Sequence, residues 1–362
     1  MQLTLLASAI LALVNGALAL PANAPTLDVT LTQVDNTLIK ATVKNTGSED
    51  VTFVHLNFFK DPAPVKKVDI FRNATEVEFT GITRRVLLNG VTDEALTTLA
   101  AGASFEDEFD VASTADLTEG GTFTIRTDGV VPLMTNHQVS GYLPYNSNEL
   151  ELEVDAAKAA AVPAAINFSA LQRRTRIASC SGSRLTALST ALRNTVSLAN
   201  AAASAASSGS SARFQEFFKT TSSSTRSTVA ARFRAIASEA SSQSSGGTTY
   251  YCTDPYGYCD SNTLAWCLPS NNIIANCDLY YSYLPALTGT CHAQDQATTS
   301  LHEFTHASAV VNPSTQDYAY GYRASTALSA SQALQNADTY ALFANGTPSP
   351  CLPPVALRTN VV

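Results

Sequence analysis

The chain has 362 residues, of which 45% are hydrophobic and 14% are charged, and its formal net charge at pH 7 is −8. An acidic chain of this kind lacks the basic excess that nucleic-acid binding requires, so we expect no nucleic-acid partner. After the N-terminus no segment is long and apolar enough to cross a bilayer, so we expect no membrane partner either.

The first 19 residues have the pattern of a secretory signal peptide. Residues 1–19 carry no charged side chain, residues 3–14 are largely apolar, and Ala17-Leu18-Ala19 provides a small-x-small cleavage site. The apolar run is shorter than the ~20 residues that a membrane-spanning helix needs. We therefore expect cleavage after Ala19 and a secreted, extracellular protein.

Residues 20–174 are predicted to form an all-β domain with a sandwich-like arrangement. Segments 27–32, 38–43 and 122–126 alternate apolar with polar residues, and turn-forming residues at 45–47 separate two of them. This pattern is typical of short strands that bury one face. The region contains no cysteine, and its acidic residues are crowded.

The pair Arg173-Arg174 marks a change in the character of the chain. Residues 1–174 contain 12 basic and 21 acidic side chains, whereas residues 175–362 contain 10 and 9, and all seven cysteines lie in the second part. A dibasic pair alone would favour two solvated arginines in a linker. An acidic, cysteine-free domain ahead of a cysteine-containing one instead indicates a propeptide (20–174), removed by cleavage after Arg174 to give a mature domain (175–362).

The second part begins with helical sequence. Residues 184–206 are rich in Ala, Leu and Ser, residues 212–219 are short and aromatic, and residues 227–240 repeat apolar side chains at helical spacing. We expect all three helices to be structural. Residues 248–285 are rich in Tyr and Cys, and we expect them to be loop-like with one short strand at 248–251.

The most informative stretch is a His-Glu-x-x-His motif at residues 302–306, in a chain that has only five histidines. Residues 296–311 contain no Gly or Pro and carry Thr and Ser near their start, and Asn312-Pro313 is a natural stop. The motif is therefore predicted to lie on a helix. The alternative is a surface helix that carries two histidines and a glutamate by chance.

On a helix, His302 and His306 lie on one face and can bind the same ion. Neutral imidazole suits Zn²⁺, and a catalytic zinc site uses three protein ligands and leaves the fourth position for water. Glu303 would take the proton from that water as it attacks a carbonyl carbon. The motif thus predicts a zinc hydrolase.

The third ligand lies outside the motif. One class of zinc protease needs Gly at position 309 and His at position 312, where this chain has Ala309 and Asn312. A glutamate ligand further along the chain is excluded because Glu303 is the last glutamate. The remaining candidates are Asp317 and Asp338, and Asp317 follows a turn-forming segment that could fold back under the motif helix.

Residues 329–345 are predicted to form a final helix that carries Asp338. A solvated charge on the helix surface is the simpler interpretation of this residue. We favour a hydrogen bond from a ligand histidine to Asp338, because such outer contacts fix the ring of a metal-bound histidine.

These segments together resemble the deuterolysin (aspzincin) family of secreted fungal zinc metalloendopeptidases. The motif at 302–306 is followed by Ser-Thr-Gln-Asp-Tyr-Ala-Tyr-Gly-Tyr at 314–322, which matches the family's Gly-Thr…Asp-x-x-Tyr-Gly segment at Asp317, Tyr320 and Gly321. Ser314 stands where the family usually has glycine. The similarity extends over the C-terminal half, including residues 254–259 and 291–296.

The resemblance implies a mainly α (α+β) zincin fold for the mature domain, with one Zn²⁺ bound by His302, His306 and Asp317. It also implies that Tyr280 donates a hydrogen bond to the oxyanion of the reaction. An N-terminal propeptide is removed in the family, so the mature N-terminus is expected near Thr175.

Seven cysteines in a secreted chain indicate disulfides, and their odd number leaves one unpaired. The residues alone do not fix the pairing. The family pattern implies three disulfides: Cys180–Cys252, Cys259–Cys277 and Cys291–Cys351. Cys267 would then be a buried, inert thiol. Glycosylation sequons, which are often unused, begin at Asn73, Asn167 and Asn345.

We therefore expect a monomeric secreted zinc endopeptidase that is made as an inactive precursor and acts on proteins and peptides. The resemblance implies a preference for basic proteins, although the near-neutral mature domain offers no bulk electrostatic attraction. The chain's own propeptide would be a partner that covers the cleft or assists folding. The alternatives are a catalytically silent secreted module that binds zinc or protein on the same scaffold, and a metal-binding or structural surface protein.

Overall fold

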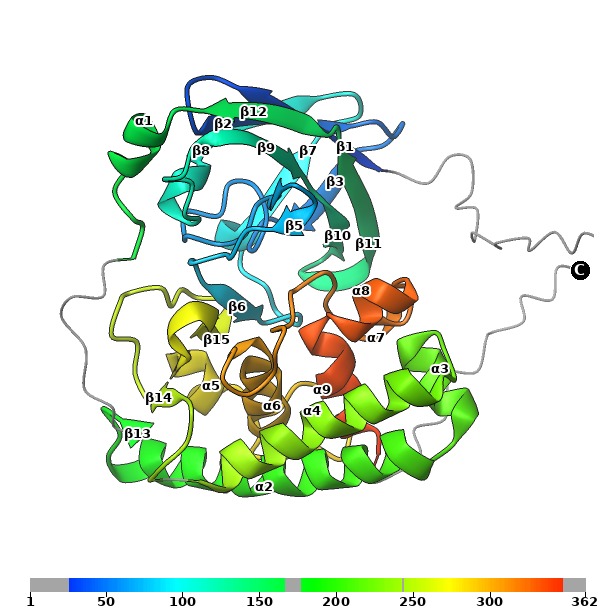
Figure 1. Ribbon diagram of the computed structural model, residues 1–362. Helices are drawn as coiled ribbons and strands as arrows, with labels where there is room; N and C mark the ends of the chain where they lie inside the picture. Colours follow the sequence, from blue (N-terminus) through cyan, green and yellow to red (C-terminus); the bar gives the residue numbers. More distant parts are fainter. Residues whose placement is uncertain (1–25, 167–176, 243, 348–362) are drawn as a thin grey trace, which may run out of the picture.

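The computed structural model describes residues 26–166, 177–242 and 244–347. They form a β-rich N-terminal part and a mainly helical C-terminal part, stacked one above the other in Figure 1. Several residues named above lie outside the described residues, among them Ala19, Asn167, Arg174 and Cys351. None of the described helices is long and apolar enough to span a membrane.

The N-terminal part is built from two sheets, as the alternating pattern predicts. The larger sheet has the order β7-β3-β10-β11-β1-β2-β8 and the smaller one β12-β9-β4-β5. The larger comprises β1 (Leu27–Gln33), β2 (Leu38–Asn45), β3 (Val51–Val54), β7 (Leu96–Leu99), β8 (Ser104–Asp110), β10 (Asp128–Thr135) and β11 (Gln138–Ser147). The smaller comprises β4 (Asp69–Arg72), β5 (Thr75–Glu76), β9 (Gly121–Arg126) and β12 (Leu150–Val154).

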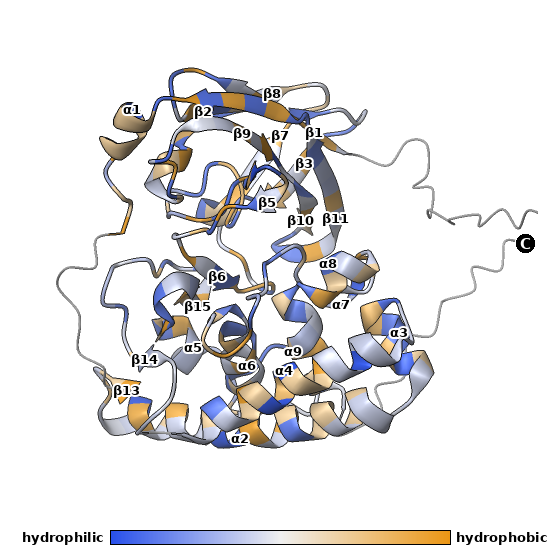
Figure 2. Cartoon of the chain, in the orientation of Figure 1, coloured by the Kyte–Doolittle hydropathy of each residue, from blue (hydrophilic) through white to orange (hydrophobic). Residues whose placement is uncertain are grey.

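Both sheets contribute to one apolar core, which makes this part a sandwich. Residues Val29 and Ile39 of the larger sheet and Ile125 and Leu152 of the smaller one are buried in the same cluster. Strand β2 alternates hydrophilic and hydrophobic residues along its length (Figure 2), and its buried positions are Ile39, Ala41, Val43 and, at its end, the polar Asn45. Two 3-10 turns, η1 (Asp93–Ala95) and η2 (Val111–Ser113), and the short α1 (Ala156–Ala160) complete this part.

The C-terminal part is organised around the helix α6 (Gln296–His306), every residue of which is buried. The long helices α2 (Gly182–Ser208) and α4 (Ser223–Ser241) run side by side at the bottom of Figure 1 and share an apolar core with α6 and α9. The remaining helices are α3 (Ser211–Phe218), α5 (Asp278–Ser282), α7 (Tyr322–Ser325), α8 (Ala330–Leu334) and α9 (Ala337–Asn345).

Two predicted helix boundaries are wrong. Helix α6 begins at Gln296 as expected but ends at His306 rather than residue 311, because the following chain folds back so that the Thr315 amide bonds to the Thr305 carbonyl oxygen at 3.0 Å. The predicted helix over 329–345 is divided into α8 and α9. At the break, the Gln335 carbonyl oxygen accepts a hydrogen bond from the Gln316 amide at 2.6 Å, which a continuous helix would prevent.

A mixed five-stranded sheet covers α6 and joins the two parts. Its order is β13-β14-β16-β15-β6, from β13 (Ile177–Ala178), β14 (Thr249–Tyr251), β16 (Ile273–Asn276), β15 (Thr263–Leu268) and β6 (Thr83–Val86). The prediction of a loop-like segment at 248–285 is therefore wrong for β15 and β16. Both strands are buried throughout, and such short apolar runs lack the alternation that identifies a half-exposed strand.

The C-terminal part contains two of the disulfides that were expected. Cys180 is bonded to Cys252 and Cys259 to Cys277. Within the described residues Cys267 is the free cysteine, and it is buried in β15. The expected pair Cys291–Cys351 is not tested, because one of its members lies outside the described ranges.

Candidate metal centre

The start of α6 is fixed by a capping box that the sequence places just before the motif. The Asp295 side chain accepts a hydrogen bond from the Thr298 amide at 2.7 Å, and the Thr298 hydroxyl bonds to the Asp295 amide at 3.3 Å. This cap fixes where the helix begins, and the four-residue spacing of His302 and His306 makes them face the same point. Their Nε2 atoms are 3.2 Å apart.

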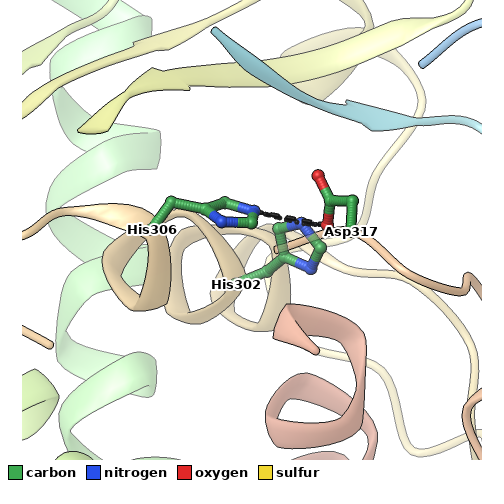
Figure 3. A group of neighbouring side chains, drawn as sticks. All are labelled: His302, His306 and Asp317. Carbon is green, nitrogen blue, oxygen red and sulfur yellow. Dashed lines mark hydrogen bonds and ion pairs between the residues drawn. The ribbon is translucent and has the colours of Figure 1, made fainter. Parts of the chain in front are cut away.

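Asp317 reaches the histidines from the segment that folds back after α6. The Thr315 carbonyl oxygen lies 2.9 Å from His306 Nδ1, which places the proton of that ring on Nδ1 and leaves the Nε2 lone pair free. Asp317 Oδ1 lies 3.2 Å from His302 Nε2 and 3.3 Å from His306 Nε2. Figure 3 shows the three side chains converging, two from the helix and one from the neighbouring loop.

The three residues fit a divalent cation. One ligand atom from each of His302, His306 and Asp317 lies within 4.8 Å of the others. Both carboxylate oxygens of Asp317 are buried without a hydrogen-bond partner among the described residues. Buried charge is costly unless it is paired or bound to a metal, and two imidazoles with one carboxylate form a common catalytic zinc ligand set.

Glu303 lies on the same helix, fully buried, and neither of its carboxylate oxygens has a hydrogen-bond partner among the described residues. Burial raises the pKa of Glu303 to about 7, although His302 and His306 act in the opposite direction. A carboxyl group with a pKa near 7 can both accept and donate a proton at neutral pH.

The histidines also shift the pKa of the aspartate between them. Burial alone would raise the pKa of Asp317, but the neighbouring His306 and His302 outweigh it and hold that pKa well below its usual range. Asp317 in turn raises the pKa of His306 against the effect of burial. The site therefore favours an ionised carboxylate facing two imidazoles.

Asp338 lies on the opposite side of the His302 ring. Its Oδ1 atom is 3.5 Å from His302 Nδ1, and its Oδ2 atom accepts a hydrogen bond from the Gly321 amide at 2.6 Å. Burial raises the pKa of Asp338, but Arg85 outweighs this effect and holds it below its ordinary value. The structure thus places Asp338 beside His302.

Arg85 is a site residue that sequence reasoning missed. It comes from β6 in the N-terminal part, and its Nη1 atom lies 2.6 Å from His302 Nδ1 and forms an ion pair with Asp338 Oδ1. The adjacent arginines Arg84-Arg85 are visible in the sequence, but no local pattern connects them with a motif more than 200 residues away.

Tyr280, for which the resemblance implies a role at the oxyanion, contacts the start of α6, and that role stays a prediction. This residue of α5 is fully buried, its hydroxyl donates to the Gln296 carbonyl oxygen at 3.2 Å, and that hydroxyl lies 3.0 Å from Ser300 Oγ. These partners belong to the first turns of α6, ahead of the motif. The hydroxyl thus contacts the start of the helix that carries the motif.

A different tyrosine lies beside the ligands. The ring of Tyr320 stacks on His302, with centroids 6.2 Å apart and an interplanar angle of 22°. Its hydroxyl donates to the backbone carbonyl oxygen of Arg84 at 2.8 Å. The sequence analysis used Tyr320 as part of a motif match and assigned it no chemical role.

The N-terminal part covers this side of the metal centre. A cavity of about 60 Å³ lies between Asp317 and residues of the N-terminal part that include Asn57, Lys66 and Tyr145. The Asn57 side chain donates to the Tyr320 hydroxyl at 2.5 Å. The segment after α6 that carries Asp317 and Tyr320 is therefore in contact with the N-terminal part as well as with α6.

Comparisons with known proteins agree with this arrangement. Residues 1–351 match the Deuterolysin metalloprotease (M35) family. The chain is 80% identical over 365 residues to a neutral protease 2 homolog of Neosartorya fischeri, covering 100% of both chains. It is 81% identical over 362 residues to a neutral protease 2 homolog of Aspergillus fumigatus, covering 100% of this chain and 97% of that protein. With a homolog of Aspergillus clavatus the identity is 73%, over 97% of this chain and 100% of that protein.

Proposed function

The chain belongs to the deuterolysin (M35) metalloprotease family and is a metalloendopeptidase, and we propose that it works with one Zn²⁺ held by His302, His306 and Asp317. The observation that carries this ligand set is the convergence of the two Nε2 atoms on a buried carboxylate that has no hydrogen-bond partner among the described residues. When bound, the ion polarises the substrate carbonyl and makes water a better nucleophile.

Glu303 moves the protons of the reaction. Its buried carboxylate accepts a proton from the attacking water and then donates it to the amine that leaves when the peptide bond breaks. A pKa of about 7 suits both directions of this transfer. Because its oxygens make no hydrogen bond with the described residues, no protein group has to be displaced first.

Tyr320 donates a hydrogen bond to the oxygen that gains negative charge. In the structure its hydroxyl already donates to a backbone carbonyl, that of Arg84, and its ring lies against His302. Once the Arg84 carbonyl has left with the N-terminal part, this hydroxyl is available to stabilise the developing oxyanion. The resemblance gave this role to Tyr280, which stays the alternative donor.

Asp338 orients His302. A carboxylate beside Nδ1 accepts the proton of that nitrogen and directs the Nε2 lone pair towards Asp317 and the ion. Asp338 therefore acts through the histidine and does not contact the reacting groups.

We also propose that the enzyme is secreted as an inactive precursor, with a signal peptide (1–19), a propeptide (20–174) and a mature domain (175–362). The position of the N-terminal sandwich over the metal centre supports this division, as do the disulfides of the C-terminal part. Cleavage after Arg174 would separate the two parts. The mature enzyme would act as a monomer.

A preference for basic substrates is supported by the charge around the site. The fully buried guanidinium of Arg85 is accommodated beside Asp338, and Glu303 and Asp317 add to the negative charge around it. A basic side chain of a substrate would meet the same carboxylates.

The test compares the activated enzyme with its Glu303→Gln variant in the cleavage of a basic protein. Loss of the proton carrier should lower kcat by roughly 10²- to 10⁴-fold, whereas Asp278→Asn, an equivalent change at an exposed carboxylate, should leave it unchanged. Chelation with o-phenanthroline should abolish activity, and Zn²⁺ should restore it. Full activity in Glu303→Gln would overturn the mechanism, and zinc binding without peptidase activity would favour a silent binding module.

A further inference from the structure

We propose that strand β6 is an inhibitory segment that occupies the peptide-binding edge of the catalytic part, and that Arg85 locks it in place. This inference rests on the proposed peptidase function and assigns a specific contact to the inactivity of the precursor. It is carried by the backbone pairing of β6, by the contacts of its two arginines and by the position of one carbonyl group.

The backbone of β6 completes a sheet that belongs otherwise to the C-terminal part. Strand β6 pairs antiparallel with β15, with Arg85 opposite Ala265 and Arg84 opposite Trp266. On its other side β15 pairs with β16, so β6 occupies the outer edge of the sheet at the boundary between the two parts (Figure 1). An open sheet edge is a template for an extended peptide, and β6 fills it.

The side chain of Arg85 anchors the strand in the metal centre. It is 2% exposed, its Nη1 atom lies 2.6 Å from His302 Nδ1, and it forms an ion pair with Asp338 Oδ1. A guanidinium can only donate hydrogen bonds, so His302 Nδ1 accepts from Nη1, which also pairs with the Asp338 oxygen nearest to that ring. Arg85 therefore fixes β6 and at the same time competes with His302 for Asp338.

The neighbouring Arg84 fixes β6 through a separate set of contacts. Its guanidinium binds both carboxylate oxygens of Asp61, at 2.8 and 3.0 Å, and donates to Thr263 Oγ1 at 2.9 Å. It also forms an ion pair with Asp260 of the C-terminal part. The two consecutive arginines thus hold the strand through two different groups of carboxylates.

The carbonyl group of Arg84 blocks a part of the catalytic machinery. Its oxygen accepts hydrogen bonds from the Tyr320 hydroxyl at 2.8 Å and from the Asn57 side chain at 2.7 Å. While these bonds persist, the hydroxyl assigned to the oxyanion is already in use. A substrate must displace β6 from β15 and from Tyr320 together.

The covalent connection makes this inhibition effective before cleavage and reversible after it. In the uncut chain β6 is tethered, so its effective concentration at the β15 edge is high. Cleavage after Arg174 converts the contact into one between two molecules, which dilution can separate. This explains how a cut outside the described residues activates a site that it does not touch.

The experiment uses the full-length chain with Arg174→Gln, which prevents processing, and measures cleavage of an added fluorogenic peptide. The parent should show almost no peptide cleavage. Arg85→Gln should raise its activity by roughly 10-fold or more, because removing one partner of a buried ion pair leaves an unpaired buried charge and destabilises the contact. Arg85→Lys keeps the charge without the forked donors and should lie between them. Arg126→Gln, at an exposed arginine of the same domain, is the matched control and should behave like the parent.

Hydrogen exchange provides a second readout that does not depend on activity. In a Glu303→Gln background, Arg85→Gln should increase exchange of the β15 amides, while β1 remains protected and shows that the N-terminal sandwich is folded. If β1 also loses protection, the N-terminal sandwich of Arg85→Gln is not folded. The inference is then tested by measuring peptide cleavage and hydrogen exchange on Arg85→Lys.

The inference is overturned if unprocessed Arg85→Gln stays as silent as its parent with β15 still protected, while the processed enzyme is active. It is also overturned if the unprocessed parent is as active as the processed enzyme. A processed enzyme without activity would instead contradict the proposed function, so the two failures are distinguishable.

Discussion

His302 is one of the residues at which the two parts of the chain meet. Its Nε2 atom faces Asp317, whereas its Nδ1 atom faces both Asp338 and the Arg85 guanidinium. The partner of His302 Nδ1 therefore depends on whether Arg85 is present. In the processed enzyme Asp338 is left as the partner of Nδ1.

We predict that Asp338→Asn in the processed enzyme lowers zinc affinity or kcat by about 10- to 100-fold, because the partner that orients His302 changes from a carboxylate to a weaker acceptor. Zinc affinity is measured by competition with a chelator and kcat by peptide cleavage. Asp278→Asn serves as the control. Unchanged values of both quantities would show that His302 is oriented without Asp338.

The two tyrosines are expected to respond in different ways. Tyr320→Phe should lower kcat by about 10²- to 10³-fold with little change in KM, since it removes a donor that acts on the developing oxyanion. Tyr280→Phe should leave kcat nearly unchanged and reduce the free energy of unfolding by about 1 kcal/mol, because it removes the hydrogen bonds to Gln296 and Ser300. The reverse outcome would restore Tyr280 as the oxyanion donor.

The role of a single residue could be predicted where the evidence for it lies close to that residue in the sequence. The spacing of His302 and His306 is a property of one helix, so the sequence alone predicts that they share a face. The exclusion of other ligands left two aspartates, and only the family resemblance chose Asp317. Arg85 reaches the site through the pairing of β6 with β15, which no pattern near Arg85 reveals.

At the scale of elements, the predictions succeed for helices, including the fully buried α6, and for half-buried strands, and they fail for strands that are buried at every position. Helix α2 and strand β2 show the expected periodicity, and both were predicted. Strand β15 is buried at every position, so its residues carry no alternation. The division between α8 and α9 depends on the hydrogen bond from the Gln316 amide to the Gln335 carbonyl oxygen. This contact comes from the segment that carries Asp317, and helix propensity does not predict it.

The disulfide between Cys180 and Cys252 ties the start of α2 to the end of β14, and we predict that it stabilises the C-terminal part substantially. It joins residues 72 apart, and loss of such a cross-link in Cys180→Ser/Cys252→Ser should cost roughly 2–4 kcal/mol. The change is measured as a lower Tm of the processed enzyme. Reductant should lower the Tm of the parent in the same direction, and an unchanged Tm in both cases would contradict the prediction.

At the scale of the whole molecule, the two parts differ in charge and in construction. Residues 1–174 have an excess of acidic side chains, whereas residues 175–362 are nearly balanced. The sandwich has its own core, and the helical part has another. The division into two parts could be read from composition and cysteine content. The shared sheet could not, because Thr83 to Val86 contains two arginines and does not resemble a buried strand.

We predict that cleavage after Arg174 is not sufficient for full activity at high protein concentration. The cut precursor should remain inhibited while the two parts stay associated, and its specific activity should increase on dilution. Peptide cleavage at several enzyme concentrations measures this effect, and gel filtration of the cut Glu303→Gln protein shows whether the parts separate. Specific activity that is independent of concentration immediately after cleavage would contradict the prediction.

The five-stranded sheet is assembled from both sides of the proposed cleavage site, since β6 precedes Arg174 and the other four strands follow it. On this proposal, the chain that folds first contains residues 20–174, whereas the processed enzyme lacks them. Once residues 20–174 have left, an unfolded molecule no longer contains the strand on which its sheet was completed. The persistence of the working enzyme is then governed by the rate at which it unfolds rather than by an equilibrium to which it can return. The free-energy barrier to unfolding then determines how long the processed enzyme lasts outside the cell.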